Sequence, residues 1–90
     1  MFKTLEELIA IIRQRKDSSA EESYTKKLLK DKKFSVEKIK EEMAELIDAI
    51  EKNSNKIHES ADVLYHLMVL LEANDIKIED VMDELKKRQK

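Results

Sequence analysis

The sequence of 90 residues contains no glycine, no proline and no cysteine, and its aromatic residues are only two phenylalanines and two tyrosines. Without proline no ring geometry breaks a helix, and without glycine any turn that needs a positive φ must use asparagine or aspartate. The absence of cysteine excludes disulfides, thiolate catalysis and cysteine-ligated metal. Few aromatic residues leave little material for sheets, so a composition with 42% charged residues favours an all-α fold.

Charge is nearly balanced, with 18 basic and 20 acidic residues and a formal net charge of −2. This balance gives no overall attraction to nucleic acid or to an anionic membrane. No apolar run reaches the roughly 18 residues of a membrane span, and the first residues, MFKTLEELIAII, carry acids where a signal peptide is apolar. We therefore expect a cytoplasmic protein of one domain, residues 1–90, whose modest core favours a homodimer or larger homo-oligomer.

Hydrophobic periodicity predicts a helical bundle of four to five helices per chain, completed by dimerisation. The expected helices cover about residues 5–16, 24–30, 36–53, 56–73 and 78–88. Capping boxes mark two of the starts, Thr4 with Glu7 and Ser19 with Glu22. Ser35 is the expected N-cap of the long third helix.

Polar residues separate the later helices. Residues 31–33 are a loop candidate, and Asn53-Ser54-Asn55 ends the third helix and caps the fourth. Asn74 is the expected left-handed residue after the fourth helix, because the chain has no glycine for that position. A short polar turn predicts that the third and fourth helices are antiparallel neighbours.

Apolar stripes predict which helix faces are buried. The stripe of the third helix comprises Val36, Ile39, Met43, Leu46, Ile47 and Ile50. The inward residues of the last helix are expected to be Ile78, Val81, Met82 and Leu85. The segment VLYHLMVLL, residues 63–71, is apolar nearly all round, so the fourth helix should be central in the bundle or lie in a subunit interface.

Two groups of acidic residues raise the question of a cation site. On a helical wheel, Glu41, Glu42 and Glu45 fall away from the apolar stripe, where solvated glutamates are ordinary. Glu59 and Asp62, however, lie on the largely apolar fourth helix, where carboxylates are costly unless they are paired or bind a metal. Across an antiparallel pair the two groups would converge, and Mg²⁺ suits clustered carboxylate oxygens. The alternative is that basic residues pair these acids, with Lys38 and Arg88 as examples.

His66 shares the stripe of Glu59 and Asp62, at spacings of i, i+3 and i+7. A histidine one turn after Asp62 would be a ligand, an acid or base, or an orienting group. We favour a hydrogen-bonded core residue, because Mg²⁺ prefers oxygen ligands. Tyr65 is expected to pack, and His58, at a helix start, is expected to be exposed.

The acids also form a recognisable pattern, E-x-x-E, 13 residues, then E-x-x-D, in Glu42-Met43-Ala44-Glu45 and Glu59-Ser60-Ala61-Asp62. This pattern resembles the signature of the all-α, MazG-like nucleotide pyrophosphohydrolases. Four further segments are similar to the phosphoribosyl-ATP pyrophosphohydrolase family: SYTKKLL at 23–29, KIKEEMAELIDAI at 38–50, ESADVLYHLMVLLEA at 59–73 and IEDVMDELKKR at 78–88. The resemblance covers nearly the whole chain.

The resemblance implies Mg²⁺-dependent hydrolysis of phosphoribosyl-ATP to phosphoribosyl-AMP and pyrophosphate, the second step of histidine biosynthesis, by a homodimer or larger assembly with its site near the subunit interface. The residues that match the family's metal ligands are Glu42, Glu45, Glu59 and Asp62. Glu41 would be a further ligand or would orient the attacking water. Substrate contacts would come from Lys27, Lys38, Tyr24 and Ser23; a lysine suits phosphate as a point charge, and plain solvation is the alternative for Lys27.

The sequence departs from the family at Lys40, where a glycine is usual, and at Phe34, where a lysine is usual. A glycine usual near residues 31–33 is absent too, so the substrate selectivity is in question while the metal ligands are unchanged. We expect the chain to act as a stand-alone enzyme, without the fused cyclohydrolase domain that some relatives carry. Two alternatives stay open, a related nucleoside triphosphate pyrophosphohydrolase and a non-catalytic helical dimerisation module.

Overall fold

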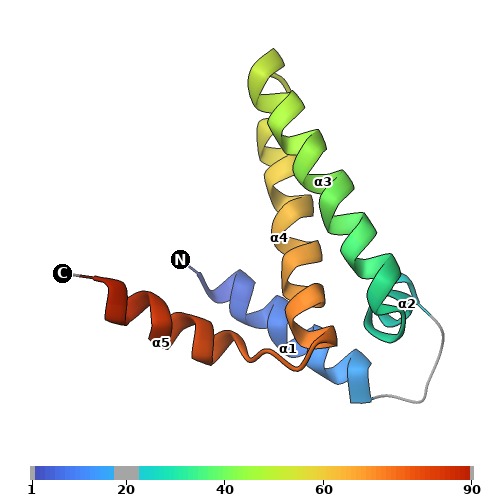
Figure 1. Cartoon of the computed structure of the whole chain (residues 1–90), viewed down its shortest axis with the longest axis vertical. Helices are drawn as coiled ribbons and strands as arrows, with labels where there is room; N and C mark the ends of the chain where they lie inside the picture. Colours follow the sequence, from blue (N-terminus) through green and yellow to red (C-terminus); the bar gives the residue numbers. More distant parts are fainter. Residues whose placement is uncertain (1, 18–22, 90) are drawn as a thin grey trace.

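The computed structural model describes residues 2–17 and 23–89, and all regular structure in these ranges is helical. The helices are α1 (Lys3–Asp17), α2 (Tyr24–Lys30), α3 (Lys32–Lys52), α4 (Lys56–Ala73) and α5 (Ile78–Arg88). Helices α3 and α4 form an antiparallel hairpin that projects as an arm from a base made by the other three helices (Figure 1). The predicted all-α fold is therefore confirmed, and dimerisation stays a prediction.

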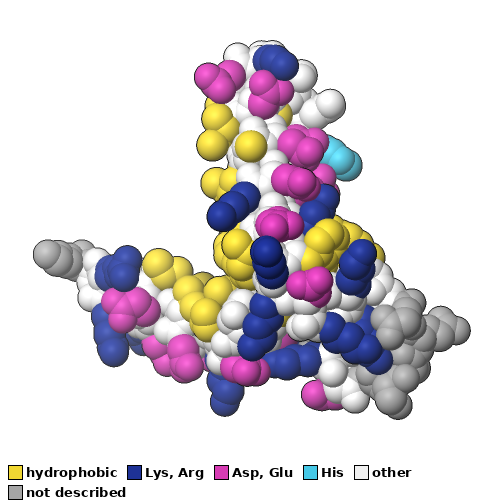
Figure 2. Space-filling model, turned by 45° about the vertical axis from the view of Figure 1, so that its right-hand side comes forward, with side chains coloured by type: hydrophobic (Ala, Val, Ile, Leu, Met, Phe, Trp, Pro, Cys, Tyr) yellow, Lys and Arg dark blue, Asp and Glu magenta, His cyan; other side chains and the backbone are white. Residues whose placement is uncertain are grey.

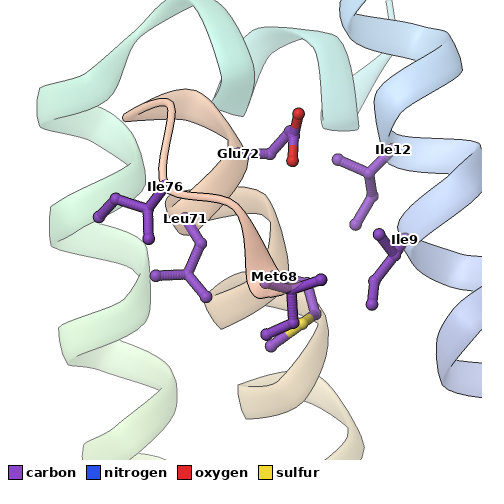
Figure 3. Close-up of a pocket in the computed structure, with 7 residues that line it drawn as sticks. Ile9, Ile12, Met68, Leu71, Glu72 and Ile76 are labelled. Carbon is purple, nitrogen blue, oxygen red and sulfur yellow. The ribbon is translucent and has the colours of Figure 1, made fainter. Parts of the chain in front are cut away.

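Helix α4 is the central element, because it contacts each of the other four helices. The buried core lies at the base, around Ile12, Leu28, Leu29, Met68, Val69 and Ala73. A small apolar pocket adjoins it, with Ile9 and Ile12 of α1 facing Met68 and Leu71 of α4 (Figure 3). No helix in the described part of the chain is long and apolar enough to cross a membrane.

Ion pairs hold the base together on its outer side. Arg13 of α1 binds Glu79 of α5 at 2.6 and 2.9 Å and also reaches Glu72 of α4 at 3.4 Å. Lys16 binds the Asp75 carboxylate at 2.7 Å, in the turn between α4 and α5. These contacts tie α1 to α5, which otherwise packs only on α4 among the described helices.

Asparagine and aspartate take the positive φ angles, as the lack of glycine predicts. Asn53 and Asn55 both have φ of 54°, and Asp75 has φ of 57°. The expectation that Asn74 would be left-handed is wrong, since its φ is −104°. The Asn74 backbone N–H still bonds to carbonyls of the last α4 turn, so the chain reverses one residue later, at Asp75.

Two helices begin earlier than predicted. Helix α3 starts at Lys32 because the Asp31 carboxylate accepts a hydrogen bond from the Phe34 backbone N–H at 3.0 Å. Ser35, the predicted cap, is instead buried within α3. Helix α1 starts at Lys3, which places Thr4 inside the helix. The predicted Ser19–Glu22 capping box lies outside the described residues.

The predicted inner face of α3 is wrong. The buried residues of α3 are Ser35, Glu42 and Ala49, a stripe spaced by seven whose two small residues allow α4 to approach closely. Glu42 is only 8% exposed, whereas Ile50 of the predicted stripe is 57% exposed. The predicted stripe residues left exposed are Val36, Met43, Ile47 and Ile50. Met82 and Leu85 of α5 are also about half exposed rather than inward.

The exposed stripe leaves the chain with more surface than its mass requires. Its accessible surface is 6949 Å², whereas a compact monomer of this mass has about 5,500 Å². Its radius of gyration is 14.2 Å against about 12 Å for a compact chain of this length. The exposed residues of the predicted stripe, among them Ile47 and Ile50, contribute to this excess.

Candidate functional site

Acidic side chains from α3 and α4 converge along the arm. Glu42, Glu45 and Glu59 each place one carboxylate oxygen within 4.8 Å of the others. Glu42 comes from the buried stripe of α3, and Glu59 comes from the first turn of α4. We call these three residues together with Asp62 the carboxylate groove. Figure 2 shows acidic side chains along the arm with a histidine among them, and lysines and arginines where the arm meets the base.

Two oxygens in the groove have no hydrogen-bond partner in the described part of the chain. Glu42 Oε2 and Glu59 Oε2 are buried and accept no hydrogen bond from any described residue. Burial raises the pKa of Glu42, the neighbouring Glu45 carboxylate raises it further, and His66 opposes the shift. Burial and Glu45 likewise raise the pKa of Glu59. Burial without a hydrogen bond disfavours the charged form of both carboxyls, and a hard divalent cation, which carboxylate oxygens prefer, would stabilise that form.

Asp62 joins the groove through Glu59. Ligand atoms of His58, Glu59 and Asp62 lie within 4.8 Å of one another, and His58 Nε2 is 3.4 Å from the Asp62 carboxylate. Asp62 also contributes to the raised pKa of Glu42. His58 is exposed, as predicted, and it lies at the site although the sequence pattern predicted no role for it there. The sequence signal was its position beside Glu59, one turn before Asp62.

Glu41 lies outside the groove. It is exposed, and its carboxylate accepts a hydrogen bond from Lys38 Nζ at 2.9 Å. This bond is the main cause of the raised pKa of Lys38. The alternative that basic residues pair the acids holds in part, because Lys38 pairs with Glu41, whereas Arg88 pairs with Glu84.

Three of the four predicted phosphate contacts, Ser23, Tyr24 and Lys27, lie at α2, and the fourth, Lys38, lies in α3. Ser23 caps this helix, its hydroxyl accepting a hydrogen bond from the Lys26 backbone N–H at 3.1 Å. Lys27 is exposed, and its Nζ lies 4.6 Å from the centre of the Phe34 ring, a cation–π contact. The Phe34 ring of α3 thus contacts a lysine of the preceding helix.

Tyr24 connects α2 to the groove through His66. The Tyr24 hydroxyl lies 2.9 Å from His66 Nε2, and His66 Nδ1 lies 2.8 Å from the backbone carbonyl of Asp62. His66 is 6% exposed, so the prediction of a hydrogen-bonded core histidine is confirmed. The Tyr24 ring stacks on Tyr65 with centroids 6.4 Å apart, and Phe34 meets its edge. Burial is the main cause of the raised pKa of Tyr24.

Comparison with known proteins identifies the family to which this chain belongs. A family model described as phosphoribosyl-ATP pyrophosphohydrolase matches residues 5–89. The phosphoribosyl-ATP pyrophosphatase of Allorhizobium ampelinum is 47% identical over 94% of this chain and 85% of that protein. The phosphoribosyl-ATP pyrophosphatase of Methanococcoides burtonii is 40% identical over 98% of this chain and 94% of that protein.

A longer relative matches equally well. The histidine biosynthesis bifunctional protein of Pyrococcus furiosus is 47% identical over 96% of this chain, which spans only 41% of that protein's length. The family match extends from α1 through α5 and includes all four residues of the carboxylate groove. This chain therefore belongs to the phosphoribosyl-ATP pyrophosphohydrolase family.

Proposed function

We propose that this chain hydrolyses phosphoribosyl-ATP to phosphoribosyl-AMP and pyrophosphate at the carboxylate groove, and that the reaction depends on Mg²⁺. Family membership makes the chain a hydrolase of histidine biosynthesis. The observation that carries the location is the pair of buried carboxylate oxygens, on Glu42 and Glu59, that have no partner among the described residues. Such a pair is unfavourable in a helix interface unless a cation occupies the space beside it.

The donor set fits Mg²⁺, which takes oxygen ligands from carboxylates and keeps some of its waters. Glu42, Glu45 and Glu59 would hold the ion, with Asp62 completing the set from the adjacent turn of α4. When bound, Mg²⁺ supplies Lewis-acid stabilisation of phosphoryl charge and helps to activate water. Glu41 is free of the groove and remains the residue we propose to orient the attacking water.

The phosphates would be bound by lysines beside the groove. Lys38 lies close enough to Glu42 for the two charges to interact, and Lys27 projects from α2 with its Nζ held over Phe34. Both are point charges that suit phosphate oxygens. This arrangement places positive charge on one side of the substrate and the carboxylates on the other, so the phosphate chain would lie between them.

We further propose that a second copy of this chain covers the open stripe of α3, defined as Val36, Met43, Ile47 and Ile50. Figure 2 shows hydrophobic side chains along one edge of the arm. The excess surface of about 1,500 Å² per chain corresponds to about 3,000 Å² buried by two chains. That area lies within the range of obligate homodimers, about 2,000–5,000 Å². The groove belongs to the same arm, so it would lie near the dimer interface.

The deciding experiment measures pyrophosphate release from phosphoribosyl-ATP with Mg²⁺ and with EDTA. We expect turnover only with the metal and little or none with ordinary nucleoside triphosphates, which serve as the substrate control. Faster release from the triphosphates would favour the broader MazG-like group. A folded protein that binds Mg²⁺ but releases no pyrophosphate from any of these substrates would contradict the proposed function.

A further inference from the structure

The hydrogen bonds of His66 determine which way the Tyr24 hydroxyl points its proton. His66 Nδ1 is 2.8 Å from the Asp62 backbone carbonyl, which can only accept a hydrogen bond. Nδ1 must therefore carry a proton. In the neutral imidazole this leaves Nε2 as an acceptor, so the Tyr24 hydroxyl, 2.9 Å away, donates to it.

The Tyr24 hydroxyl has one proton, and it donates that proton in the hydrogen bond to His66 Nε2. The Tyr24 oxygen keeps lone pairs and can still accept a hydrogen bond from another group. Phosphate oxygens are acceptors and gain nothing from such an oxygen. Tyr24 is 45% exposed as a whole residue, so part of its side chain is open to a ligand.

We propose that Tyr24 accepts a hydrogen bond from an N–H or O–H group on the base or ribose of the substrate, and that His66 is the positioning residue that sets this polarity. The inference rests on the proposed function and deepens it, because it names the chemistry of one substrate contact. It also changes the role expected for Tyr24, from a phosphate contact to a nucleoside contact, and leaves the phosphates to Lys27 and Lys38.

The surroundings of Tyr24 hold its ring in place. Tyr65 stacks against it with an interplanar angle of 18°, and the rings of Phe34 and His66 meet it edge-on. A hydroxyl held in this way loses little freedom when a ligand binds, so its one free acceptor position can discriminate between ligand groups.

Nitrogen-15 NMR of the histidine side chains tests the polarity in the unmodified protein. We expect the His66 ring, when neutral, to show a protonated Nδ1 and an unprotonated Nε2, the reverse of the tautomer that free histidine prefers. Exposed His58 serves as the internal reference in metal-free protein. A His66 ring with its proton on Nε2 would overturn the inference, because Tyr24 would then be free to donate to phosphate.

A pair of matched variants tests the ligand contact without requiring turnover. Tyr24→Phe removes the hydroxyl bonded to His66, and Tyr65→Phe removes a hydroxyl that bonds Thr25 and bridges the same two helices. We expect Tyr24→Phe to weaken phosphoribosyl-AMP binding by about two- to tenfold, the effect of one hydrogen bond. Pyrophosphate, which contains only phosphate groups, should bind both variants and the parent equally in the presence of Mg²⁺.

The two binding results separate this inference from the proposed function. Equal weakening of pyrophosphate and phosphoribosyl-AMP by Tyr24→Phe would reject the inference, and so would no weakening of either. Selective weakening of phosphoribosyl-AMP would support it. AMP and ribose 5-phosphate, tested in the same way, assign the donor to one half of the nucleotide. Absence of turnover, with the selective weakening intact, would reject the proposed reaction alone.

Discussion

Glu42 of α3 and Glu59 of α4 each bury one carboxylate oxygen in the helix interface, without a hydrogen-bond partner among the described residues. Glu45 lies within 4.8 Å of both. Burial, and then repulsion by the Glu45 carboxylate, raise the pKa values of Glu42 and Glu59. The groove is therefore a strained part of the metal-free fold, and the first predictions concern how cations and protons relieve it.

Loss of a groove carboxylate should weaken Mg²⁺ binding, whereas loss of Glu41 should not. We expect Glu45→Gln and Asp62→Asn each to reduce Mg²⁺ affinity by at least about tenfold, because each removes a charged oxygen donor. Glu41→Gln is the matched control, since Glu41 pairs with Lys38 outside the groove. Isothermal titration calorimetry measures all three. An equal loss with Glu41→Gln would place that residue among the ligands.

Metal-free protein should lose stability as the pH rises. The folded-state pKa values of Glu42 and Glu59 lie above their ordinary value of 4.5, so the native state binds more protons than the unfolded chain. Their contribution to the free energy of unfolding is fully present below pH 4.5, and it is lost as the pH rises through the raised pKa values of the folded state. Thermal unfolding with EDTA should show this fall, with a change of about 4–8 °C in Tm for each kcal/mol.

Two further conditions check the assignment to the groove. Saturating Mg²⁺ at neutral pH should raise Tm, because the ion binds the native state. Glu42→Gln should flatten the fall, since it removes one of the titrating groups. A metal-free profile that rises through the same interval would contradict the charge repulsion we describe.

The ion pairs at the base should lose their contribution to stability as the pH falls, which is opposite to the trend expected for Glu42 and Glu59. Arg13 lowers the pKa of Glu79 to about 2, and Lys16 lowers that of Asp75. Their contribution is present above the ordinary carboxyl values and is lost as the pH falls toward 2. We expect a small effect that added salt reduces, because both carboxylates are exposed. Comparing Arg13→Gln with the parent by circular dichroism at low pH tests it; identical acid profiles would contradict the role of Arg13.

Phe34 should matter for substrate binding through Lys27. Phe34→Leu removes the ring under the Lys27 ammonium, and we expect KM for phosphoribosyl-ATP to rise about two- to fivefold with kcat little changed. Phe34→Tyr keeps an aromatic face and is the conservative control. Phe34→Lys introduces the residue usual in the family. We expect its KM to be lower than that of Phe34→Leu, because the new ammonium group can bind phosphate itself. A rise in KM with Phe34→Tyr equal to that with Phe34→Leu would exclude the cation–π contact as the cause.

A charge on the open stripe of α3 should separate the subunits. We expect Ile47→Glu to convert a dimer to a monomer in light-scattering chromatography, because the glutamate would be buried without a partner. Phe2→Glu changes a more exposed apolar residue ahead of α1, 72% against 52% for Ile47, and is the control. A parent protein that is monomeric at micromolar concentration would contradict the proposed interface.

The sequence by itself determined most of the helices and the set of acids. Helices α2, α4 and α5 have the predicted bounds because their apolar periodicity is bounded by polar residues with strong turn and capping preferences. The central place of α4 followed from its nearly uniform apolar surface. The converging acids were predicted because an antiparallel hairpin with a short turn fixes which residues face one another along its length.

Only the tertiary structure decided which face of α3 meets α4. Periodicity identifies an apolar stripe but not the surface that covers it, and α4 instead packs on the small side chains of Ser35 and Ala49, taking Glu42 into the interface. Because this face of α3 packs on α4, Glu41 points away from the carboxylate groove and pairs with Lys38. The direction of the Tyr24 proton likewise depends on a bond between His66 and a backbone carbonyl, and a sequence pattern carries no information about such a bond until the helices are packed.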